Sequence, residues 1–133
     1  AVGAHGVIIP QRRAVGLTAS VSRTSAGAVE YIPVARVSNI SQSISHLRQG
    51  GIWTVGVDMT GDKDYTQADY QQSVALVIGA EGKGLSRLVK ERCDQIVSIP
   101  MKGHIASLNA SVAAALVMYE AMRQRTESSR AGC

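Results

Sequence analysis

The chain has no phenylalanine, and aromatic residues of all kinds make up only 4% of it. Its core must therefore be built from Val, Ile, Leu and Ala, which the hydrophobic content of 45% allows. Two cysteines, Cys93 and Cys133, and three separated histidines give neither a disulfide framework nor the spacing of a metal site. There is no secretory signal and no apolar run of transmembrane length, so we expect a cytoplasmic protein.

An excess of acidic residues is also absent, since the formal net charge is +4. A basic balance suits a polyanion such as RNA, but solvated helix faces carry similar charge in many proteins. We expect Lys83 and Arg87 to be solvated rather than bound to phosphate. The basic residues gather at Arg12–Arg13, at Lys83, Arg87, Lys90 and Arg92, and at Arg123 and Arg125.

Apolar segments of strand length alternate with segments of helical pattern. Helices are predicted over 18–26, from the Asn39 cap to Gly50, over 85–92, and from Ser107 to about Arg125. The segment 58–72 is polar and is predicted to be a surface loop. The predicted strands are Gly6–Pro10, Ile52–Val57, Ser73–Ile78 and Gln95–Ile99, and Tyr31–Val37 is extended but interrupted by Pro33.

Strands that are apolar throughout and alternate with helices predict a parallel sheet covered on both faces. At 133 residues the chain is long enough for one α/β domain and too short for two. We place that domain at 1–125 and predict a polar, disordered tail at 126–133. The chain has no initial methionine and begins next to a predicted buried strand, so we expect it to be part of a longer protein.

Two glycine-containing loops follow predicted strands and lead into predicted helices. The first loop, Gly79–Gly84, reads GAEGKG, and the second, Ile99–Ser111, reads IPMKGHIASLNAS. Glycine lets a backbone approach a ligand closely, and a helix start offers free N–H groups. Side by side, such loops would form a pocket of main-chain donors and acceptors, suited to a flat polar molecule such as a nucleoside.

The first loop fits neither of two common phosphate-binding patterns. A P-loop requires a glycine five residues before Gly82-Lys83 and a Ser or Thr after it, but Val77 and Gly84 occupy these positions. A dinucleotide-binding turn requires a third glycine where Arg87 stands. A protein that binds ATP or GTP through the first loop therefore remains only as a poorly supported alternative.

Taken together, the two loops resemble the second and third motifs of the SpoU (TrmH-like) family, the RNA ribose 2′-O-methyltransferases of the SPOUT class. One motif is a strand ending in Gly-Ser/Ala-Glu-Gly-x-Gly, which residues 79–84 match. The other is a strand ending in Ile-Pro-Met, then a glycine and Ser-Leu-Asn-x-Ser-x-Ala, which residues 99–113 match. Val7–Pro10 and Ile52–Gly56 are similar to the upstream strands, so the likeness covers nearly the whole chain. It is closest to bacterial enzymes that methylate a guanosine ribose in large-subunit ribosomal RNA.

The resemblance implies an α/β fold with a mostly parallel sheet, helices on both faces and a C-terminal trefoil knot, a rare exception to the rule against knots. It implies S-adenosylmethionine as the cofactor and no metal. Family members are homodimers, so an RNA substrate, rRNA rather than tRNA, would meet both subunits. The residues that the resemblance assigns to cofactor binding are Gly79, Ile99, Met101, Leu108 and Asn109.

The implied reaction is the attack of a ribose hydroxyl on the sulfonium methyl of the cofactor. That hydroxyl is too weakly acidic to ionise freely at neutral pH, so it needs a base or a strong hydrogen-bond acceptor. Glu81 is the only acid in either loop and could orient an arginine or the ribose, and Ser107 and Asn109 can donate or accept at a helix start. These three are the catalytic candidates.

In the family, the arginine proposed to activate the hydroxyl belongs to a first motif that would precede Ala1 and has no match here. The alternative function is therefore a non-catalytic RNA-binding or assembly module that keeps the knot and the dimer. Some residues also have structural interpretations: Asn109 and Ser107 as helix caps, and Cys93 as a small buried residue. Leu116, Tyr119 and Met122 belong to the core or to a dimer interface, and His104 to an exposed loop.

Overall fold

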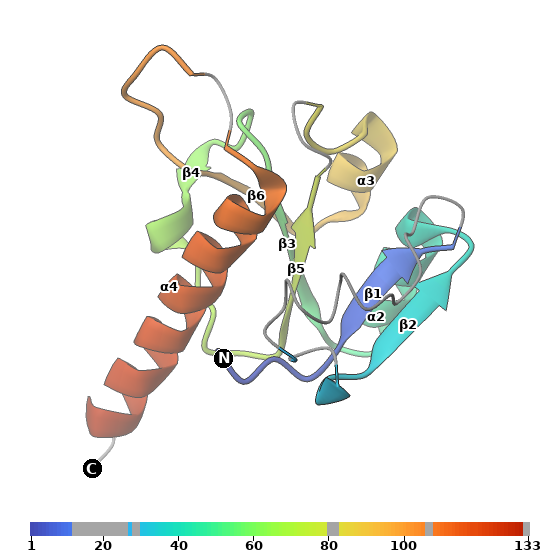
Figure 1. Ribbon diagram of the computed structural model, residues 1–133, viewed down its shortest axis with the longest axis horizontal. Coiled ribbons are helices and arrows are strands. Elements are labelled where there is room, and N and C mark those ends of the chain that lie inside the picture. Colours follow the sequence, from blue (N-terminus) through green and yellow to red (C-terminus); the bar gives the residue numbers. More distant parts are fainter. Residues whose placement is uncertain (12–26, 28–29, 80–82, 106–107, 132–133) are drawn as a thin grey trace. The chain divides into compact units, whose positions relative to one another are not determined.

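A computed structural model describes the chain except for residues 12–26, 28–29, 80–82, 106–107 and 132–133 (Figure 1). The chain divides into two compact units, Ala1–Ser43 and Ile44–Cys133. The helix predicted at 18–26 and the arginines at 12–13 lie outside the described residues. None of the helices within the described residues is long and apolar enough to cross a membrane.

The first unit contains a pair of parallel strands, β1 (Val7–Pro10) and β2 (Val34–Val37). The pair is extended at its start by a hydrogen bond from the Val7 amide to the Pro33 carbonyl, at 2.9 Å. Proline has no N–H to donate, so Pro33 contributes only its carbonyl and the strand begins after it. This explains why the predicted extended segment 31–37 is a strand only over its second half.

The second unit contains a four-stranded parallel sheet, as the apolar strand pattern predicted. In spatial order its strands are β4 (Lys63–Asp64), β6 (Gln95–Ser98), β3 (Trp53–Val57) and β5 (Val74–Ile78). The central strand β3 pairs with β5 from Trp53↔Val74 to Val57↔Ile78. It pairs with β6 from Val55↔Gln95 to Val57↔Val97.

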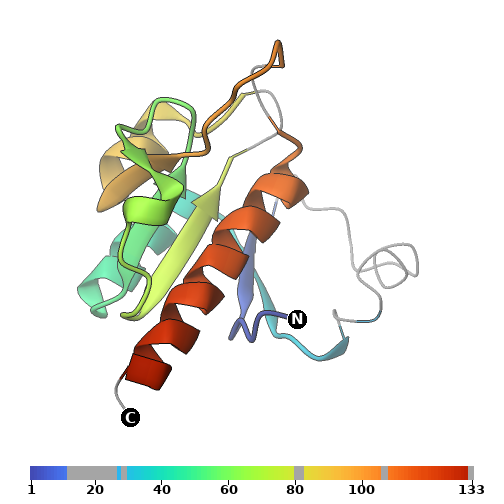
Figure 2. The same ribbon diagram turned by 90° about the vertical axis from the view of Figure 1, so that its left-hand side faces the viewer.

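Helical segments cover both faces of this sheet. Successive residues of β3 point to opposite faces, so their contacts show what packs on each face. Val55 and Val57 pack with residues of α4 (Ala110–Ala131), which runs along one face in Figure 2. On the other face Gly56 lies against Leu85 and Cys93, the residues that flank α3 (Arg87–Arg92). The prediction of an α/β fold with helices on both faces is therefore confirmed.

The other helical segments are α2 (Ile40–Gln49) and a single 3₁₀ turn, η2 (Tyr65–Gln67). The α2 helix begins as predicted, since the Asn39 side chain accepts a hydrogen bond from the Gln42 amide at 3.1 Å. It ends at a pair of glycines of which Gly51 has a φ of +87°, a left-handed conformation that favours glycine.

The segment 58–72, predicted to be a surface loop, contributes to the core. It contains β4 and η2, and its Ala68 and Tyr70 are buried. Tyr70 is completely buried, and its hydroxyl donates to the Tyr65 carbonyl at 2.6 Å. Burial, together with the negative charges of Glu120 and Asp64, raises the pKa of Tyr70 to about 12. The core consists of Val55, Val57, Ala68, Tyr70, Val97, Val117 and Ala121.

The last helix is longer and begins later than predicted. The α4 helix starts at Ala110 rather than Ser107, and it continues to Ala131 rather than ending near Arg125. Its distal half is tied to the segment before β5, because Gln124 donates to the Ala68 carbonyl at 2.9 Å and accepts from the Tyr70 amide at 3.1 Å. The predicted tail at 126–133 is thus helical as far as Ala131.

Candidate functional site

The candidate site lies at the carboxyl ends of the three long strands of the sheet. Because β3, β5 and β6 are parallel and in register at Val57↔Ile78 and Val57↔Val97, the residues that follow them share one edge. These residues are Asp58, Gly79 and Ile99. The crevice beyond the carboxyl ends of parallel strands is where α/β sheets commonly bind ligands. The sheet therefore brings the starts of both predicted loops together, as Figure 1 shows at the upper end of β5 and β6.

In the first loop, Gly79 and Gly84 are in close backbone contact. A Cβ atom on Gly79 would overlap the carbonyl carbon and oxygen of Gly84. Gly84 itself has a φ of +65°, and a Cβ atom on it would overlap the Asp58 carboxylate. Both positions thus require glycine for a physical reason. Glu81, a predicted catalytic residue, lies outside the described residues.

Asp58, directly after β3, accepts a hydrogen bond from the residue that follows the first loop. Its Oδ1 atom accepts from the Leu85 amide at 2.9 Å, and its Oδ2 atom accepts from the Thr60 amide at 3.0 Å. The Lys90 ammonium lies 3.6 Å from the same carboxylate, whose side chain is only 5% exposed. Burial raises the pKa of Asp58, but the hydrogen bonds from Thr60 and Leu85 and the charge of Lys90 outweigh it, so the pKa is lowered overall.

The sequence prediction missed Asp58 because it was grouped with the polar segment that follows. A signal was present, since an acidic residue directly after a buried strand lies at the edge where parallel sheets bind ligands.

The second loop contributes residues that range from half-buried to exposed. Ile99 packs against the core, Leu108 is half-buried, and Met101 is 36% exposed. Two apolar side chains and an accessible thioether thus lie along this loop, as a wall for a flat ring would require. Ser107 lies outside the described residues.

Asn109 caps α4, as predicted. Its Oδ1 atom accepts from the Ser111 amide at 2.8 Å and from the Ser111 hydroxyl at 2.5 Å. The side-chain amide N–H₂ group takes no part in this cap, and the residue is exposed. Asn109 can therefore stabilise the helix and donate to a ligand at the same time.

The basic residues around the two loops differ in what they contact. Arg87 is 93% exposed at its side chain and pairs with Glu91 at 3.2 Å, as expected for a solvated helix face. Lys83 and His104 are exposed. Arg125, in contrast, donates to the Tyr70 and Gln72 carbonyls at 2.8 Å each, so part of the basic charge stabilises the fold.

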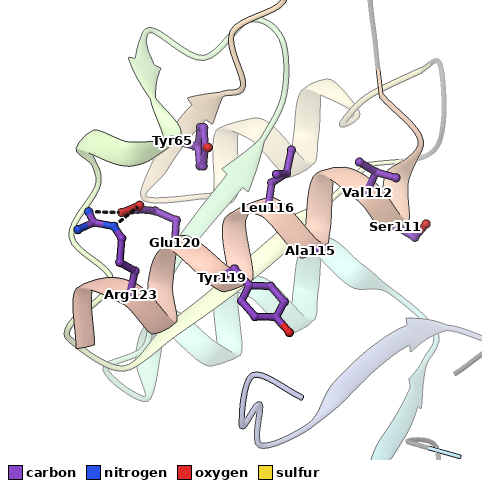
Figure 3. A pocket seen from close by; sticks show the side chains of 8 residues that line it. All are labelled: Tyr65, Ser111, Val112, Ala115, Leu116, Tyr119, Glu120 and Arg123. Atoms are coloured by element: carbon purple, nitrogen blue, oxygen red, sulfur yellow. Dashed lines mark hydrogen bonds and ion pairs between the residues drawn. The ribbon is translucent and has the colours of Figure 1, made fainter. Parts of the chain in front are cut away.

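A shallow groove of about 570 Å³ runs along α4 (Figure 3). Its walls are mostly apolar and its far end carries the ion pair between Arg123 and Glu120, at 2.8 Å. It lies along the helix rather than in the strand-end loops, so it is a separate surface feature. The residues that line it are Tyr65, Ser111, Val112, Ala115, Leu116, Tyr119, Glu120 and Arg123.

The residues predicted to lie on the apolar side of the last helix are not in the core. Leu116 is 39% exposed, Tyr119 50% and Met122 36%. The residues of α4 that pack into the core are Val117 and Ala121. Of the two predicted roles for Leu116, Tyr119 and Met122, burial in the core is therefore wrong.

The described part of the chain contains neither a reactive cysteine nor a cluster of metal ligands. Cys93 is buried, as predicted, and burial raises the pKa of its thiol to about 11, which leaves it unreactive at neutral pH. Among the described residues there is no group of three His, Cys, Asp or Glu side chains that could hold a metal ion.

The structure is that of an α/β protein with a parallel sheet. Beyond the carboxyl ends of its strands lie a loop with closely packed glycines and the capped start of a helix. The profile of the SpoU rRNA Methylase family matches residues 1–119. The chain therefore belongs to the SpoU rRNA Methylase family.

Individual relatives agree with this assignment. The chain is 54% identical over 125 residues to YacO of Bacillus subtilis (strain 168), named a TrmH family tRNA/rRNA methyltransferase, covering 94% of this chain and 50% of that protein. The crystal structure of the SpoU methyltransferase AviRb from Streptomyces viridochromogenes, in complex with AdoMet, superposes with a TM-score of 0.84 at 38% identity, over 95% of this chain and 52% of AviRb.

The TrmH/SpoU tRNA modifying enzyme of A. aeolicus superposes with a TM-score of 0.87 at 27% identity, over 96% of this chain and 65% of that one. The chain thus spans about half the length of the curated relatives it matches.

Proposed function

We propose that this chain carries the cofactor-binding part of an RNA methyltransferase that transfers a methyl group from S-adenosylmethionine to a ribose 2′-hydroxyl. The observation that carries this proposal is the contact of Gly79 with Gly84 at the carboxyl edge of the sheet, in a chain that belongs to the SpoU family. The AdoMet complex of the related AviRb supports the choice of cofactor. Within this function we favour a guanosine of large-subunit rRNA as the target, because the two loop motifs resemble those of enzymes that methylate such a nucleotide.

The residues at the strand ends suit this cofactor. At Gly79 the backbone carries no side chain, and Ile99 and Leu108 are half-buried apolar residues. Asn109 has, at the start of α4, an amide N–H₂ group that takes no part in the helix cap. When bound, the cofactor supplies the electrophilic methyl group that a ribose hydroxyl of RNA attacks. Asn109 would donate hydrogen bonds from its side-chain amide to polar groups of the bound cofactor or RNA. The glycines of the first loop would leave space for these molecules, because they have no side chains.

Two residues of the proposed site, Glu81 and Ser107, are assigned from the sequence motifs alone. Glu81 would orient an arginine or the ribose, and Ser107 would donate or accept beside Asn109. We also propose that the C-terminal part of the chain forms the trefoil knot of the SPOUT class, on the strength of its family and of its likeness to solved SpoU and TrmH enzymes.

Calorimetric titration of the folded chain with S-adenosylhomocysteine tests the proposal, with ATP as the control ligand. Binding of S-adenosylhomocysteine without binding of ATP supports it. Binding of ATP alone favours a phosphate-binding first loop and contradicts it. The absence of binding by a sample with a cooperative unfolding transition also contradicts it.

Replacement of Asn109 by alanine is expected to weaken S-adenosylhomocysteine binding by about 10-fold or more, since both a helix cap and a donor are lost. Lys63→Ala is the control, because Lys63 is exposed in β4 and its pairing with Val97 uses only the backbone. Its affinity should equal that of the wild type. Equal losses in the two variants, both folded, would show that Asn109 is not in the site.

The two roles of Asn109 can be separated with Asn109→Asp. The aspartate keeps the acceptor that binds the Ser111 amide but lacks the N–H₂ donor. We expect the melting temperature to stay near that of the wild type while the affinity remains as low as in Asn109→Ala. An affinity restored by aspartate would mean that Asn109 acts only as a cap.

We further propose that the exposed apolar face of α4 binds a second copy of the chain. Val112, Leu116 and Tyr119 all line the groove along α4 (Figure 3), and each is more than a third exposed. Contiguous apolar patches on a soluble protein commonly mark interaction surfaces. A second α4 presents the same apolar patch, so two copies related by two-fold symmetry would each cover the patch of the other.

Leu116→Glu is expected to convert a dimer into a monomer, because a carboxylate would be buried without a partner in the interface. The control is Leu88→Glu, since Leu88 is 47% exposed on α3 and lies outside the groove. Sedimentation velocity distinguishes the two states. A monomeric wild type, or a Leu116→Glu variant that stays dimeric, would refute the proposed interface.

A further inference from the structure

We propose that Asp58 is a positioning residue for the cofactor: it fixes the far end of the first loop and thereby sets the affinity of the site. The inference rests on the proposed function, since it concerns the same strand-end site. Neither of the two family motifs contains Asp58, which lies 21 residues before Gly79 in the sequence and directly beside it at the sheet edge.

The first step of the argument is the hydrogen bond between Asp58 and Leu85. The Oδ1 atom accepts from the Leu85 amide at 2.9 Å, and this bond joins residues 27 positions apart in a buried setting. Leu85 directly follows Gly84, the last residue of the first loop. The carboxylate therefore holds the end of the loop against the end of β3.

The second step is the fit between Asp58 and Gly84. A side chain on Gly84 would overlap the Asp58 carboxylate, so the two groups touch without intervening space. The φ of +65° at Gly84 turns the chain so that the next amide, that of Leu85, points at this carboxylate. The left-handed turn and the acceptor beneath it thus form one arrangement.

The third step carries the effect to the opposite end of the loop. The backbone of Gly84 lies directly against Gly79, closely enough to exclude a Cβ atom. A shift of Gly84 must therefore change its contact with Gly79. Because a displacement of about 1 Å in a positioning group can cost about 100-fold in function, this coupling is large enough to measure.

The charge of Asp58 strengthens its hold. A carboxylate accepts hydrogen bonds that are about twice as strong as those of a neutral group. The hydrogen bonds from Thr60 and Leu85, together with Lys90 at 3.6 Å, lower the pKa of Asp58 and so favour this charged form. Removing the acceptor would leave the buried Leu85 amide without a partner, which is costly in its own right. Asp58 also binds Thr60, so a purely structural role in the turn after β3 has to be tested separately.

Three variants separate the two roles. Asp58→Ala removes every acceptor, and Asp58→Asn keeps one neutral acceptor. Thr60→Val removes the hydroxyl that donates to the carboxylate and accepts from Lys90 at 3.4 Å, and leaves the Thr60 amide in place. For each we would measure the dissociation constant of S-adenosylhomocysteine, the urea midpoint, and the amide resonance and hydrogen exchange of Leu85 without ligand. The last two readouts do not depend on a bound cofactor.

We expect Asp58→Ala to weaken binding by about 10- to 100-fold and to accelerate exchange of the Leu85 amide. Asp58→Asn should recover a large part, but not all, of the affinity and of the protection of the Leu85 amide. Thr60→Val should bind S-adenosylhomocysteine with wild-type affinity even if its urea midpoint falls. Should Asp58→Ala not fold, the comparison of Asp58→Asn with Thr60→Val carries the test, with a loss of affinity expected in the first only.

Two results would overturn the inference: wild-type affinity in Asp58→Ala, or equal losses of affinity and of urea midpoint in Asp58→Asn and Thr60→Val. Failure of the proposed function has a different signature, because the wild type itself would then not bind S-adenosylhomocysteine. In that case an unchanged Leu85 amide in Asp58→Ala would additionally show that Asp58 does not hold the loop.

Discussion

Replacing Gly79 by alanine is expected to reduce the affinity for S-adenosylhomocysteine by about 100-fold or more. The smallest possible side chain already overlaps the backbone of Gly84, so the first loop must move before the substitution fits. Backbone atoms have no alternative rotamer with which to relieve the overlap, unlike the tip of a long side chain. Calorimetric titration measures the loss, and Gly79→Val, with a bulkier branch, should abolish binding.

The matched control for Gly79 is Gly50→Ala. At Gly50, a Cβ atom would meet the Leu47 carbonyl oxygen at 3.5 Å, an ordinary contact, and its φ is not in the left-handed region. This variant should bind with wild-type affinity and be as stable as the wild type or slightly more so. Circular dichroism must show that Gly79→Ala is folded at the temperature of the titration. Wild-type affinity in a folded Gly79→Ala would place the pocket elsewhere.

Tyr70→Ala is expected to lower the free energy of unfolding by about 3–5 kcal/mol, the range for truncating a large buried aromatic side chain. Tyr70 is completely buried in the core, and its hydroxyl donates to the Tyr65 carbonyl at 2.6 Å. Alanine would leave both a cavity and an unpaired carbonyl. Urea unfolding followed by circular dichroism measures the change.

Two further variants assign the loss at Tyr70 to its causes. Tyr70→Phe keeps the ring and removes only the hydrogen bond to Tyr65, so we expect a smaller loss of about 1 kcal/mol. Tyr31→Ala is the control for removal of a tyrosine ring, because Tyr31 is 90% exposed and its loss should change stability by less than about 0.5 kcal/mol. A loss below about 1 kcal/mol in Tyr70→Ala would mean that the segment 58–72 is not part of the core.

Three of the four strands of the sheet could be predicted from local sequence because they are mostly apolar; the two-residue β4, which reads Lys-Asp, could not. Ile52–Val57, Ser73–Ile78 and Gln95–Ile99 each overlap an observed parallel strand within one residue of its ends. The same reasoning failed at Tyr70, whose neighbours are polar. Tyr70 is held in the core by Gln124 and Arg125, more than 50 positions away, and local composition carries no trace of such partners.

The candidate site was predictable to the extent that its geometry is local. The resemblance to the SpoU motifs identified Gly79 and Asn109, and the structure adds a physical reason for each: close backbone contact at Gly79 and the cap of α4 at Asn109. Asp58 was not identified because it was grouped with the polar segment 58–72. Its position after a buried strand was a signal for the site, but its bond to an amide 27 residues further along the chain is visible only in the structure. The core alternative for Leu116, Tyr119 and Met122 was wrong because alanine-rich turns can pack on either side of a helix. Only the packing against the sheet decides that Val117 and Ala121 face inward.

The attachment of the segment before β5 to α4 has a consequence for how this chain can vary in evolution. Gln124 and Arg125 bind the main-chain groups of Ala68, Tyr70 and Gln72, so they recognise where the backbone is and not which side chains it carries. The exposed side chain of Gln71 can therefore vary in sequence while the course of the backbone stays fixed. Evolution should instead conserve Gln124 and Arg125, which hold this segment. They lie in a part of α4 whose sequence is typical of a charged helix surface.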